Sequence, residues 1–188
     1  MPTPQPKPFN IMSKPIGPRC NIDCSYCYYL EKEKQFPDEK KFRMSDAVLE
    51  TYVRELITTS AKAGMPEATF AWQGGEPTML GVEFFQQAVA LQKQYAPNGM
   101  KVVNAFQTNG ILLEAEWGHF LSENAFLVGL SIDGPKQVHD RYRLDRAGRP
   151  TFDKVMRGLE VLQEYGVEHN ALTVVHRANS GRSRTTVG

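Results

Sequence analysis

The sequence predicts an α/β protein built from repeated strand–helix units around a parallel sheet. Short apolar stretches alternate along the 188-residue chain with longer stretches whose apolar residues share one helical face, which is typical of βα units. A hydrophobic fraction of 41% and a net charge of +1 suit one domain with a substantial core. The five units expected make an incomplete (β/α) TIM-like barrel, because a closed barrel takes eight strands and about 250 residues.

The N-terminal third is expected to form a strand, a loop and a long helix. The first strand is expected over residues 9–16, and the charged segment 31–41 is interpreted as a solvated connection. A helix is expected over residues 46–62, because Ser45 can cap its start and Gly64 can stop it. Its apolar residues share one face: they are Leu49, Tyr52, Val53, Leu56 and Ile57.

The rest of the chain continues the alternation of strand and helix. Short apolar stretches predict strands, and the longer periodic stretches between them predict helices. Gly99 and Gly166 follow two of these helices, at positions where helices commonly stop. Strands are expected at residues 68–72, 101–106, 126–132 and 168–175, and helices at residues 82–95, 114–122 and 152–165.

The composition and the chain ends limit the cellular locations and the binding partners that the sequence favours. The small net charge does not favour nucleic-acid binding, and no apolar run is long enough for a membrane helix. Residues 1–8 are Pro-rich and polar, without the apolar stretch of a signal peptide, and are expected to be an extended lead-in. Residues 9–178 are expected to be the core domain and residues 179–188 a disordered or aberrant tail. Clustered cysteines without an export signal favour a reducing cytoplasm.

All three cysteines lie in one eight-residue stretch after the first predicted strand. They are Cys20, Cys24 and Cys27, in a C-x3-C-x2-C pattern, and cysteine thiolates are the usual ligands of iron–sulfur clusters. Three ligands leave one iron of a four-iron cluster open, and an open metal position is where chemistry takes place. A zinc site would need a fourth ligand, and the nearest histidine is His119. A disulfide would leave an odd thiol.

Further motifs follow the predicted strands, where ligand-binding groups gather in parallel α/β folds. Paired glycines after residue 73 let a ligand approach the backbone, and the adjacent carboxylate could bind an ammonium group, although a plain tight turn would look the same. Gln107 and Asn109 could bind substrate or cofactor or simply form a turn. Ser131 could bind a ribose hydroxyl, and Arg143 could pair with a carboxylate. None of the four histidines has ligand spacing.

The sequence resembles the radical S-adenosylmethionine (SAM) superfamily in three features. They are the cysteine motif, the aromatic pair Tyr28 and Tyr29 after it, and the Gly-Gly-Glu motif. That resemblance implies a six-strand partial barrel, of which about five units are present here. It also implies a [4Fe-4S] cluster whose open iron is chelated by the amino and carboxylate groups of SAM. The reduced cluster then splits SAM into methionine and a 5′-deoxyadenosyl radical, which abstracts hydrogen from a substrate.

A narrower resemblance rests on four sequence segments: Trp72 to Pro77, Gln107 to Gly110, Ser131 to Pro135, and Asp140 to Arg143. This combination is similar to the anaerobic sulfatase-maturating enzymes, radical SAM proteins of the SPASM type. It implies that a Cys or Ser of an unfolded or nascent sulfatase is oxidised to Cα-formylglycine. It also implies a flavodoxin or ferredoxin as electron donor.

The same resemblance implies roles for individual residues. Cys20, Cys24 and Cys27 would ligate the cluster. The positions that would lie near SAM are Tyr26, Gly74, Gly75, Glu76, Gln107, Ser131 and Arg143. Tyr29 and Gln73 match positions near the target side chain and are the candidate catalytic residues.

The chain departs from the family in its length. Family members are about twice as long, and their C-terminal half closes the barrel, adds two auxiliary clusters and supplies a carboxylate base. This chain has no cysteine after Cys27, so the sequence is interpreted as an N-terminal fragment with impaired maturation activity. The alternatives are another SPASM-type peptide-modifying enzyme, a non-catalytic remnant and a zinc module.

Overall fold

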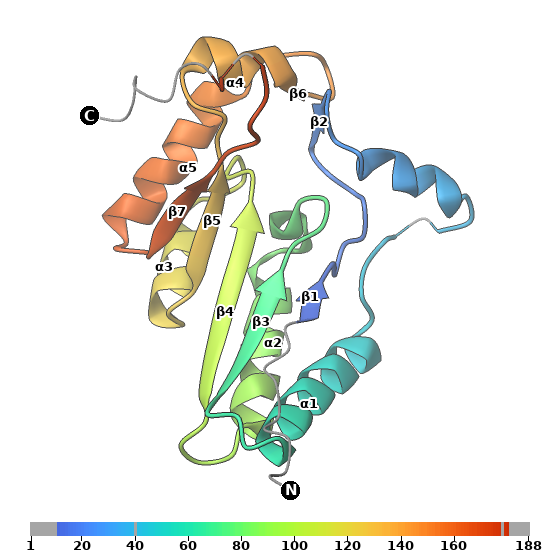
Figure 1. Ribbon diagram of the computed structural model, residues 1–188, viewed down its shortest axis with the longest axis vertical. Coiled ribbons are helices and arrows are strands. Elements are labelled where there is room, and N and C mark those ends of the chain that lie inside the picture. Colours follow the sequence, from blue (N-terminus) through green and yellow to red (C-terminus); the bar gives the residue numbers. More distant parts are fainter. Residues whose placement is uncertain (1–10, 40, 178, 181–188) are drawn as a thin grey trace, which may run out of the picture.

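The computed structural model describes residues 11–39, 41–177 and 179–180. Strands in the order β1-β3-β4-β5-β7 form one parallel sheet within this part of the chain. All of its strands point the same way, so their C-terminal ends meet at one edge (Figure 1). The strands are β1 Ile11–Ser13, β3 Glu67–Trp72, β4 Lys101–Thr108, β5 Leu127–Ser131 and β7 His169–Leu172.

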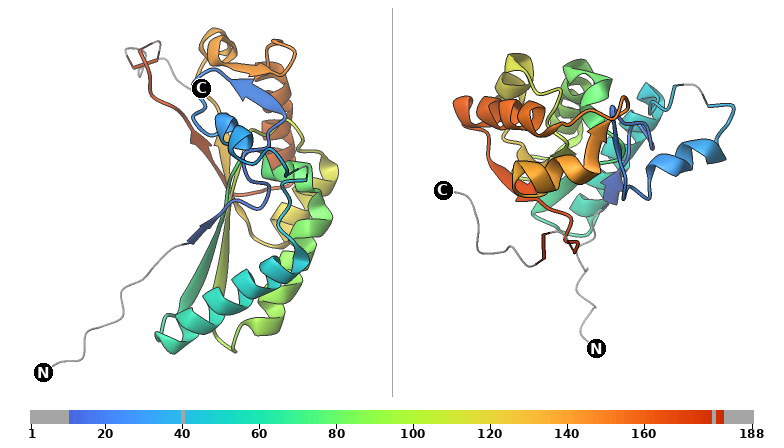
Figure 2. Two further views of the ribbon diagram at one scale, coloured as in Figure 1. Left: turned by 90° about the vertical axis from the view of Figure 1, so that its right-hand side faces the viewer. Right: turned by 90° about the horizontal axis from the view of Figure 1, so that it is seen from above.

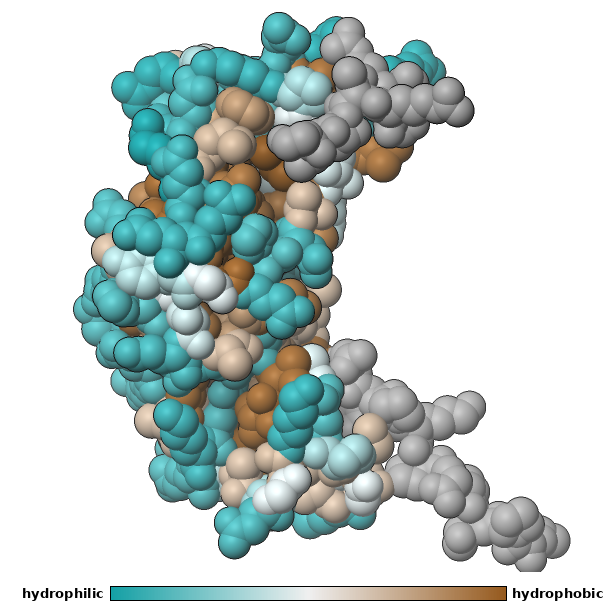
Figure 3. Space-filling model, turned by 90° about the vertical axis from the view of Figure 1, so that its left-hand side faces the viewer, coloured by the Kyte–Doolittle hydropathy of each residue, from teal (hydrophilic) through white to brown (hydrophobic). Residues whose placement is uncertain are grey.

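Helices cover one face of the sheet and leave the other face open (Figure 2). The space-filling view shows the molecule hollowed on its open side (Figure 3). The covering helices are α1 Asp46–Lys62, α2 Val82–Tyr95, α3 Ala115–Glu123 and α5 Phe152–Glu164. The predicted α/β class is confirmed: the described strands form a partial barrel that does not close on itself.

Side-chain alternation along the strands explains why one face carries the core. In β3, Ala68, Phe70 and Trp72 are buried, whereas the residues between them stay partly exposed, as expected for a strand with one covered face. The covered face is rich in aromatic rings that meet edge to face, such as Trp72 on Phe85 and Phe85 on Phe106. Such pairs prefer this geometry because ring edges are positive and ring faces negative.

The predicted helices agree closely with the observed ones. α1 and α2 have the predicted bounds, α3 is displaced by one residue at both ends, and α5 is one residue shorter at its C-terminal end. Ser45 caps α1, because its hydroxyl accepts a hydrogen bond from the Val48 amide at 3.3 Å. Gly64 follows the helix with a φ of +68°, a conformation that glycine adopts without strain.

Several short elements were not predicted from the sequence. An antiparallel pair joins β2 Ile22–Cys24 to β6 Arg143–Asp145, and α4 Lys136–Tyr142 precedes β6. Two 3-10 helices, η1 Leu30–Gln35 and η2 Pro77–Leu80, lie in connections. Three-residue strands are too short to show periodicity, and their pairing joins distant parts of the chain. The segment 31–39 is solvated as predicted, since η1 has no buried residue.

The first strand is shorter than predicted, and the chain ends fall largely outside the description. Residues 9–10 and the lead-in 1–8 are not among the described residues, and the chain turns after Ser13, where the Gly17 amide donates to the Lys14 carbonyl. Asn179, assigned to the tail, makes a side-chain hydrogen bond of 2.8 Å to the Val174 carbonyl. Residues 181–188 of the predicted tail lie outside the described residues. No helix among the described residues is long and apolar enough to cross a membrane.

We expect Phe106→Ala to lower the free energy of unfolding by about 3–5 kcal/mol, because it empties a filled aromatic site. Phe106 is 1% exposed, and its ring centroid lies 5.0 Å from that of Phe85. Urea denaturation measures the change. Phe36→Ala is the control, since Phe36 is 57% exposed and should cost less than about 1 kcal/mol. Equal costs for the two variants would contradict this account of the core.

Candidate functional site

One pocket at the C-terminal edge of the sheet contains every site residue predicted from the sequence. The chain reaches it from the loop after β1, from the ends of β3, β4 and β5, and from β6. The pocket is lined by all twelve predicted residues, Cys20, Cys24, Tyr26, Cys27, Tyr29, Gln73, Gly74, Gly75, Glu76, Gln107, Ser131 and Arg143. It is also lined by six others, Pro18, Ile22, Leu30, Thr108, Asn109 and Val174.

The cysteine loop is held in place by backbone pairing with a distant segment. Cys24 lies opposite Arg143 in the β2–β6 ladder, and the Ser25 amide donates to the Tyr142 carbonyl at 3.0 Å. From the other side, Arg146 Nε donates to the Cys20 carbonyl at 2.9 Å. These bonds fix the backbone that carries the thiols, so their direction does not depend on side-chain freedom alone.

The paired glycines allow a close backbone approach within the protein itself. The Gly75 amide donates to the Gly17 carbonyl at 2.8 Å, and the Glu76 amide donates to the Arg19 carbonyl at 2.8 Å. A Cβ at Gly75 would lie 1.7 Å from the Arg19 carbonyl oxygen, which is backbone and cannot yield. The close approach that requires glycine is therefore made by the chain leading into Cys20, and not only by a ligand.

Glu76 lies buried beneath the pocket, where the protein satisfies its carboxylate. Oε1 accepts hydrogen bonds from the Thr78 hydroxyl at 2.6 Å and the Thr108 hydroxyl at 2.7 Å, and Oε2 accepts one from the Asn109 amide at 2.7 Å. Burial raises the pKa of Glu76, and these hydrogen bonds oppose that rise. The carboxylate thus ties the end of β3 to the end of β4, whereas we expected it to face an ammonium group.

The three thiols are free cysteines that share the pocket. Burial, followed by the charge of Glu76, raises the pKa of Cys20 to about 11. Burial raises that of Cys24 to about 12, although Arg143 opposes the shift. Both thiols are therefore protonated near neutral pH, and binding a metal would release their protons. Asn109 donates to Asn21 Oδ1 at 2.7 Å and contacts the Cys20 sulfur at 3.8 Å, which orients this thiol.

The thiols fit a cluster ligand set. No group of three His, Cys, Asp or Glu residues in the described ranges converges on a position for one metal ion. A cluster does not require such convergence, because each thiolate binds its own iron. The three cysteines line one pocket together with polar residues such as Gln107 and Arg143, which suits a cluster with one iron left for a second ligand.

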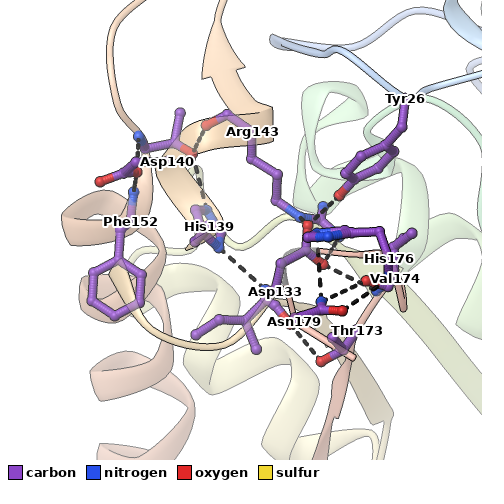
Figure 4. A network of polar contacts seen from close by, with 12 residues as sticks. Tyr26, Asp133, His139, Asp140, Arg143, Phe152, Thr173, Val174, His176 and Asn179 are labelled. Carbon is purple, nitrogen blue, oxygen red and sulfur yellow. Dashed lines mark hydrogen bonds and ion pairs between the residues drawn. The ribbon is translucent and has the colours of Figure 1, made fainter. Parts of the chain in front are cut away.

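Arg143, which lines the pocket, forms a buried ion pair with Asp133 (Figure 4). Arg143 Nε donates to Asp133 Oδ2 at 2.9 Å and Nη2 donates to Oδ1 at 3.1 Å, which is a bidentate geometry. The Tyr26 hydroxyl also donates to Asp133 Oδ2, and the Val174 amide donates to Oδ1 at 3.0 Å. Burial alone would raise the pKa of Asp133, but the bonds from Arg143 and Tyr26 outweigh it and lower the pKa.

His139 supports this ion pair from behind, which the sequence did not indicate (Figure 4). Its Nδ1 accepts from the Asp133 amide at 3.4 Å, and its Nε2 lies 3.1 Å from the Thr151 hydroxyl. Thr151 in turn donates to the Arg143 carbonyl at 2.6 Å, so the ring is neutral and carries its proton on Nε2. Burial, with the charge of Arg143, lowers the pKa of His139 from 6.5 to about 4.

A row of polar side chains crosses the front of the pocket. Lys14 Nζ donates to Gln73 Oε1 at 2.8 Å, and Gln73 Nε2 donates to Gln107 Oε1. Lys14 Nζ also lies 4.4 Å from the centroid of the Tyr29 ring, a cation–π distance. The two candidate catalytic residues, Tyr29 and Gln73, are thus neighbours of one lysine.

Sequence reasoning missed several residues that the fold brings to or behind the pocket, and four of them make the polar contacts described above. Lys14, Asp133, His139 and Val174 carry no local pattern that separates them from surface or turn residues. Asp133 precedes Gly134 and Pro135, a sequence typical of an exposed turn, yet it is 0% exposed. The one available signal was its place between Ser131 and the basic stretch ending in Arg143, since a carboxylate and a guanidinium near one strand end often pair.

Comparison with known proteins identifies the class. A family model described as the radical SAM superfamily matches residues 15–182. The chain therefore belongs to the radical SAM superfamily, as its motifs suggested.

Its relatives narrow the resemblance further. The chain is 46% identical over 174 residues to a serine-type anaerobic sulfatase-maturating enzyme of Bacteroides thetaiotaomicron, covering 93% of this chain and 41% of the relative. It is 41% identical over 168 residues to a cysteine-type enzyme of Clostridium perfringens, covering 89% of this chain and 44% of the relative. It thus spans less than half the length of these relatives.

Solved structures of similar fold point to the same class of protein. The structure described as native anSMEcpe with bound AdoMet and Cp18Cys peptide matches with a TM-score of 0.81 and 40% identity, over 92% of this chain and 45% of that one. Streptococcus suis SuiB, at 14% identity and a TM-score of 0.59, shares the fold.

We expect stability to fall as the pH drops from about 6.5 towards 4, because His139 stays neutral in the folded chain while the unfolded chain takes up the proton. The slope from this residue reaches about 1.4 kcal/mol per pH unit. Urea denaturation at pH 7.5, 6 and 5 measures it.

The control for this prediction is His139→Asn, which keeps an acceptor but does not titrate in this range. Its free energy of unfolding should change less between pH 7.5 and 5 than that of the unaltered chain. Parallel pH dependence in the two chains would show that His139 is not buried in the neutral form.

Proposed function

We propose that this chain holds a [4Fe-4S] cluster on Cys20, Cys24 and Cys27 and binds SAM against it, as the catalytic core of a radical SAM enzyme of the sulfatase-maturase type. The observation that carries the proposal is the shared pocket, which the three cysteines line together with the other predicted residues. When bound and reduced, the cluster supplies the electron that splits SAM into methionine and a 5′-deoxyadenosyl radical.

The residues opposite the thiols fit the polar ends of SAM. Arg143 uses Nε and Nη2 for Asp133, and Nη1 has no bond to any described residue, so it can take the SAM carboxylate. Ser131 suits a ribose hydroxyl, and the backbone of Gly74 and Gly75 suits the amino group. Tyr26 lies beside Arg143, with the guanidinium 5.6 Å from its ring centroid.

Gln107, at the C-terminal end of β4, completes this set. Its amide nitrogen can donate to a ligand, because its oxygen already accepts from Gln73. Glu76 is the exception within the set. We assign it a positioning role, since its hydrogen bonds go to residues of the protein.

The substrate we propose is a Cys or Ser in a sulfatase polypeptide that is unfolded or nascent. Both serine-type and cysteine-type sulfatase-maturating enzymes are among the similar proteins, and one solved relative is described with a bound peptide. The radical takes hydrogen from the target Cβ, and loss of one proton and one electron, the latter to a one-electron carrier of the flavodoxin or ferredoxin class, then yields the aldehyde from Ser. From Cys the same loss yields a thioaldehyde, which water hydrolyses to the aldehyde of Cα-formylglycine with release of hydrogen sulfide. Tyr29 and Gln73 lie at the pocket front, where they can orient that side chain.

The remaining parts of the proposal concern partners and organisation. A flavodoxin or ferredoxin is the proposed electron donor, and the cytoplasm is the proposed location because the thiols must stay reduced. No nucleic-acid or membrane partner is proposed. Residues 9–178 form the proposed core domain. Complete maturation is proposed to need the further length that the relatives have, since this chain spans 41–44% of two of them.

The experiment is anaerobic reconstitution of the chain with iron and sulfide, followed by iron analysis. SAM and dithionite are then added, and 5′-deoxyadenosine is measured. We expect about four irons per chain and 5′-deoxyadenosine formation. Cys24→Ala should lose the cluster, and Ser25→Ala is the control, since Ser25 is exposed beside it. Iron without 5′-deoxyadenosine would overturn the SAM assignment, and an absence of iron would favour the non-catalytic remnant.

A second prediction concerns Arg143. We expect Arg143→Lys to weaken SAM binding to the reconstituted chain about tenfold, because one ammonium cannot hold Asp133 bidentately and also bind the SAM carboxylate. Equilibrium dialysis with labelled SAM measures the dissociation constant. Arg157→Lys is the matched control on the exposed side of α5. Unchanged affinity in Arg143→Lys would remove Arg143 from the SAM site.

A further inference from the structure

Lys14 is a partly buried lysine that contacts two pocket-lining residues, Gln73 and Tyr29. It follows β1 directly, and its neighbours are set by the register of the sheet. Ser13 pairs with Trp72, and Trp72 pairs with Phe106. The next position on each strand therefore brings Lys14, Gln73 and Gln107 into one row.

Strand alternation decides which way this row faces. Trp72 and Phe106 are buried in the core beneath the helices. The side chains one position later point to the opposite face, which is the open side of the sheet and the front of the pocket. The row is thus a consequence of the parallel register and not of chance contact between flexible side chains.

The ammonium group fixes the polarity of the row. Lysine can only donate, so Gln73 must present its oxygen to Lys14, at 2.8 Å. Gln73 Nε2 then donates to Gln107 Oε1, which leaves the amide nitrogen of Gln107 as the donor at the end of the row. Without the lysine, both amides could turn over and offer acceptors instead.

Lys14 also holds the second candidate catalytic residue. Its Nζ lies 4.4 Å from the centroid of the Tyr29 ring, a contact that restrains a ring on a half-exposed loop. Tyr29 lies on the cysteine loop and Gln73 lies after β3. One cation therefore links the two elements that present these residues to the pocket.

We infer that Lys14 is a positioning residue for the substrate side chain: it holds Tyr29 and Gln73 and makes the Gln73–Gln107 row offer donors to the pocket. This inference rests on the proposed function, because it assumes that the target side chain enters beside Tyr29 and Gln73. A donor row suits an acceptor on the substrate, such as the sulfur or oxygen of a Cys or Ser, or a peptide carbonyl.

The first test concerns the geometry and requires no substrate. Lys14→Met keeps the length of the stem and removes the charge, Lys14→Arg keeps the charge, and Lys101→Met makes the same change at the opposite end of the sheet. In 1H–15N spectra of the full iron-free chain, the side-chain amides of Gln73 and Gln107 should shift in Lys14→Met and stay in place in Lys101→Met. Unmoved amides in Lys14→Met would overturn the inference whether or not the chain binds SAM.

The second test concerns the function, on the reconstituted chain with SAM. A fluorescent peptide containing one Cys is compared with the same peptide containing Ala, by anisotropy under anaerobic conditions. The preference is the ratio of the dissociation constant of the Ala peptide to that of the Cys peptide. We expect this ratio to fall about tenfold in Lys14→Met and to return largely in Lys14→Arg. The affinity for SAM should stay unchanged in both variants.

The outcomes separate the inference from the proposed function. A preference that survives Lys14→Met would overturn the positioning role. Parallel losses of SAM and peptide affinity would also overturn it, since they indicate a general structural role. If the unaltered chain binds SAM without preferring the Cys peptide, the proposed substrate is wrong, and the amide spectra alone decide the geometry of Lys14.

Discussion

The buried pair of Asp133 and Arg143 is the interaction on which the pocket depends. It joins the end of β5 to β6, and its partners Tyr26 and Val174 extend it to the cysteine loop and to the segment after β7. A buried ion pair is expensive to desolvate, and it is retained only where its geometry and additional hydrogen bonds offset that cost. Here both carboxylate oxygens and two guanidinium nitrogens are engaged, so the pair specifies one arrangement of four segments.

A neutral histidine is the right support for such a pair. A charged ring at His139 would lie near Arg143 and would place a second N–H against the Asp133 amide, which is already a donor. The lowered pKa of His139 keeps the ring neutral and is therefore compatible with the ion pair beside it. The chain from His139 through Thr151 to the Arg143 carbonyl then links this support to the start of α5.

The other side of the pocket is built from backbone rather than charge. The strand-like contacts of Gly75 and Glu76 with Gly17 and Arg19 bring the loop after β3 against the approach to Cys20. Glu76 then fastens that loop to β4 through Thr108 and Asn109. Tyr29, Gln73 and Gln107, which we propose to meet a ligand, line the same pocket. The residues that hold the shape of the pocket are thus largely different from those proposed to contact a ligand.

The sequence by itself determined the parallel α/β class, most of the helices and twelve of the residues that line the pocket. Helices such as α1 and α2 could be predicted to the residue, because periodicity, caps and stop glycines are local signals. The cysteine motif and the motifs that follow the strands could be predicted to lie close together, because parallel strands end at one edge of the sheet.

Only the tertiary structure decided how these residues are supported. The β2–β6 pairing, the Asp133–Arg143 pair, the neutral His139 and the Lys14 row join positions far apart in the chain, and none has a local pattern. Glu76 shows the opposite case. Its motif suggested that the carboxylate binds a ligand, yet the carboxylate accepts hydrogen bonds from Thr78, Thr108 and Asn109. Long-range hydrogen bonds depend on which segments the packed sheet brings together, and that physical choice is made only when the chain folds.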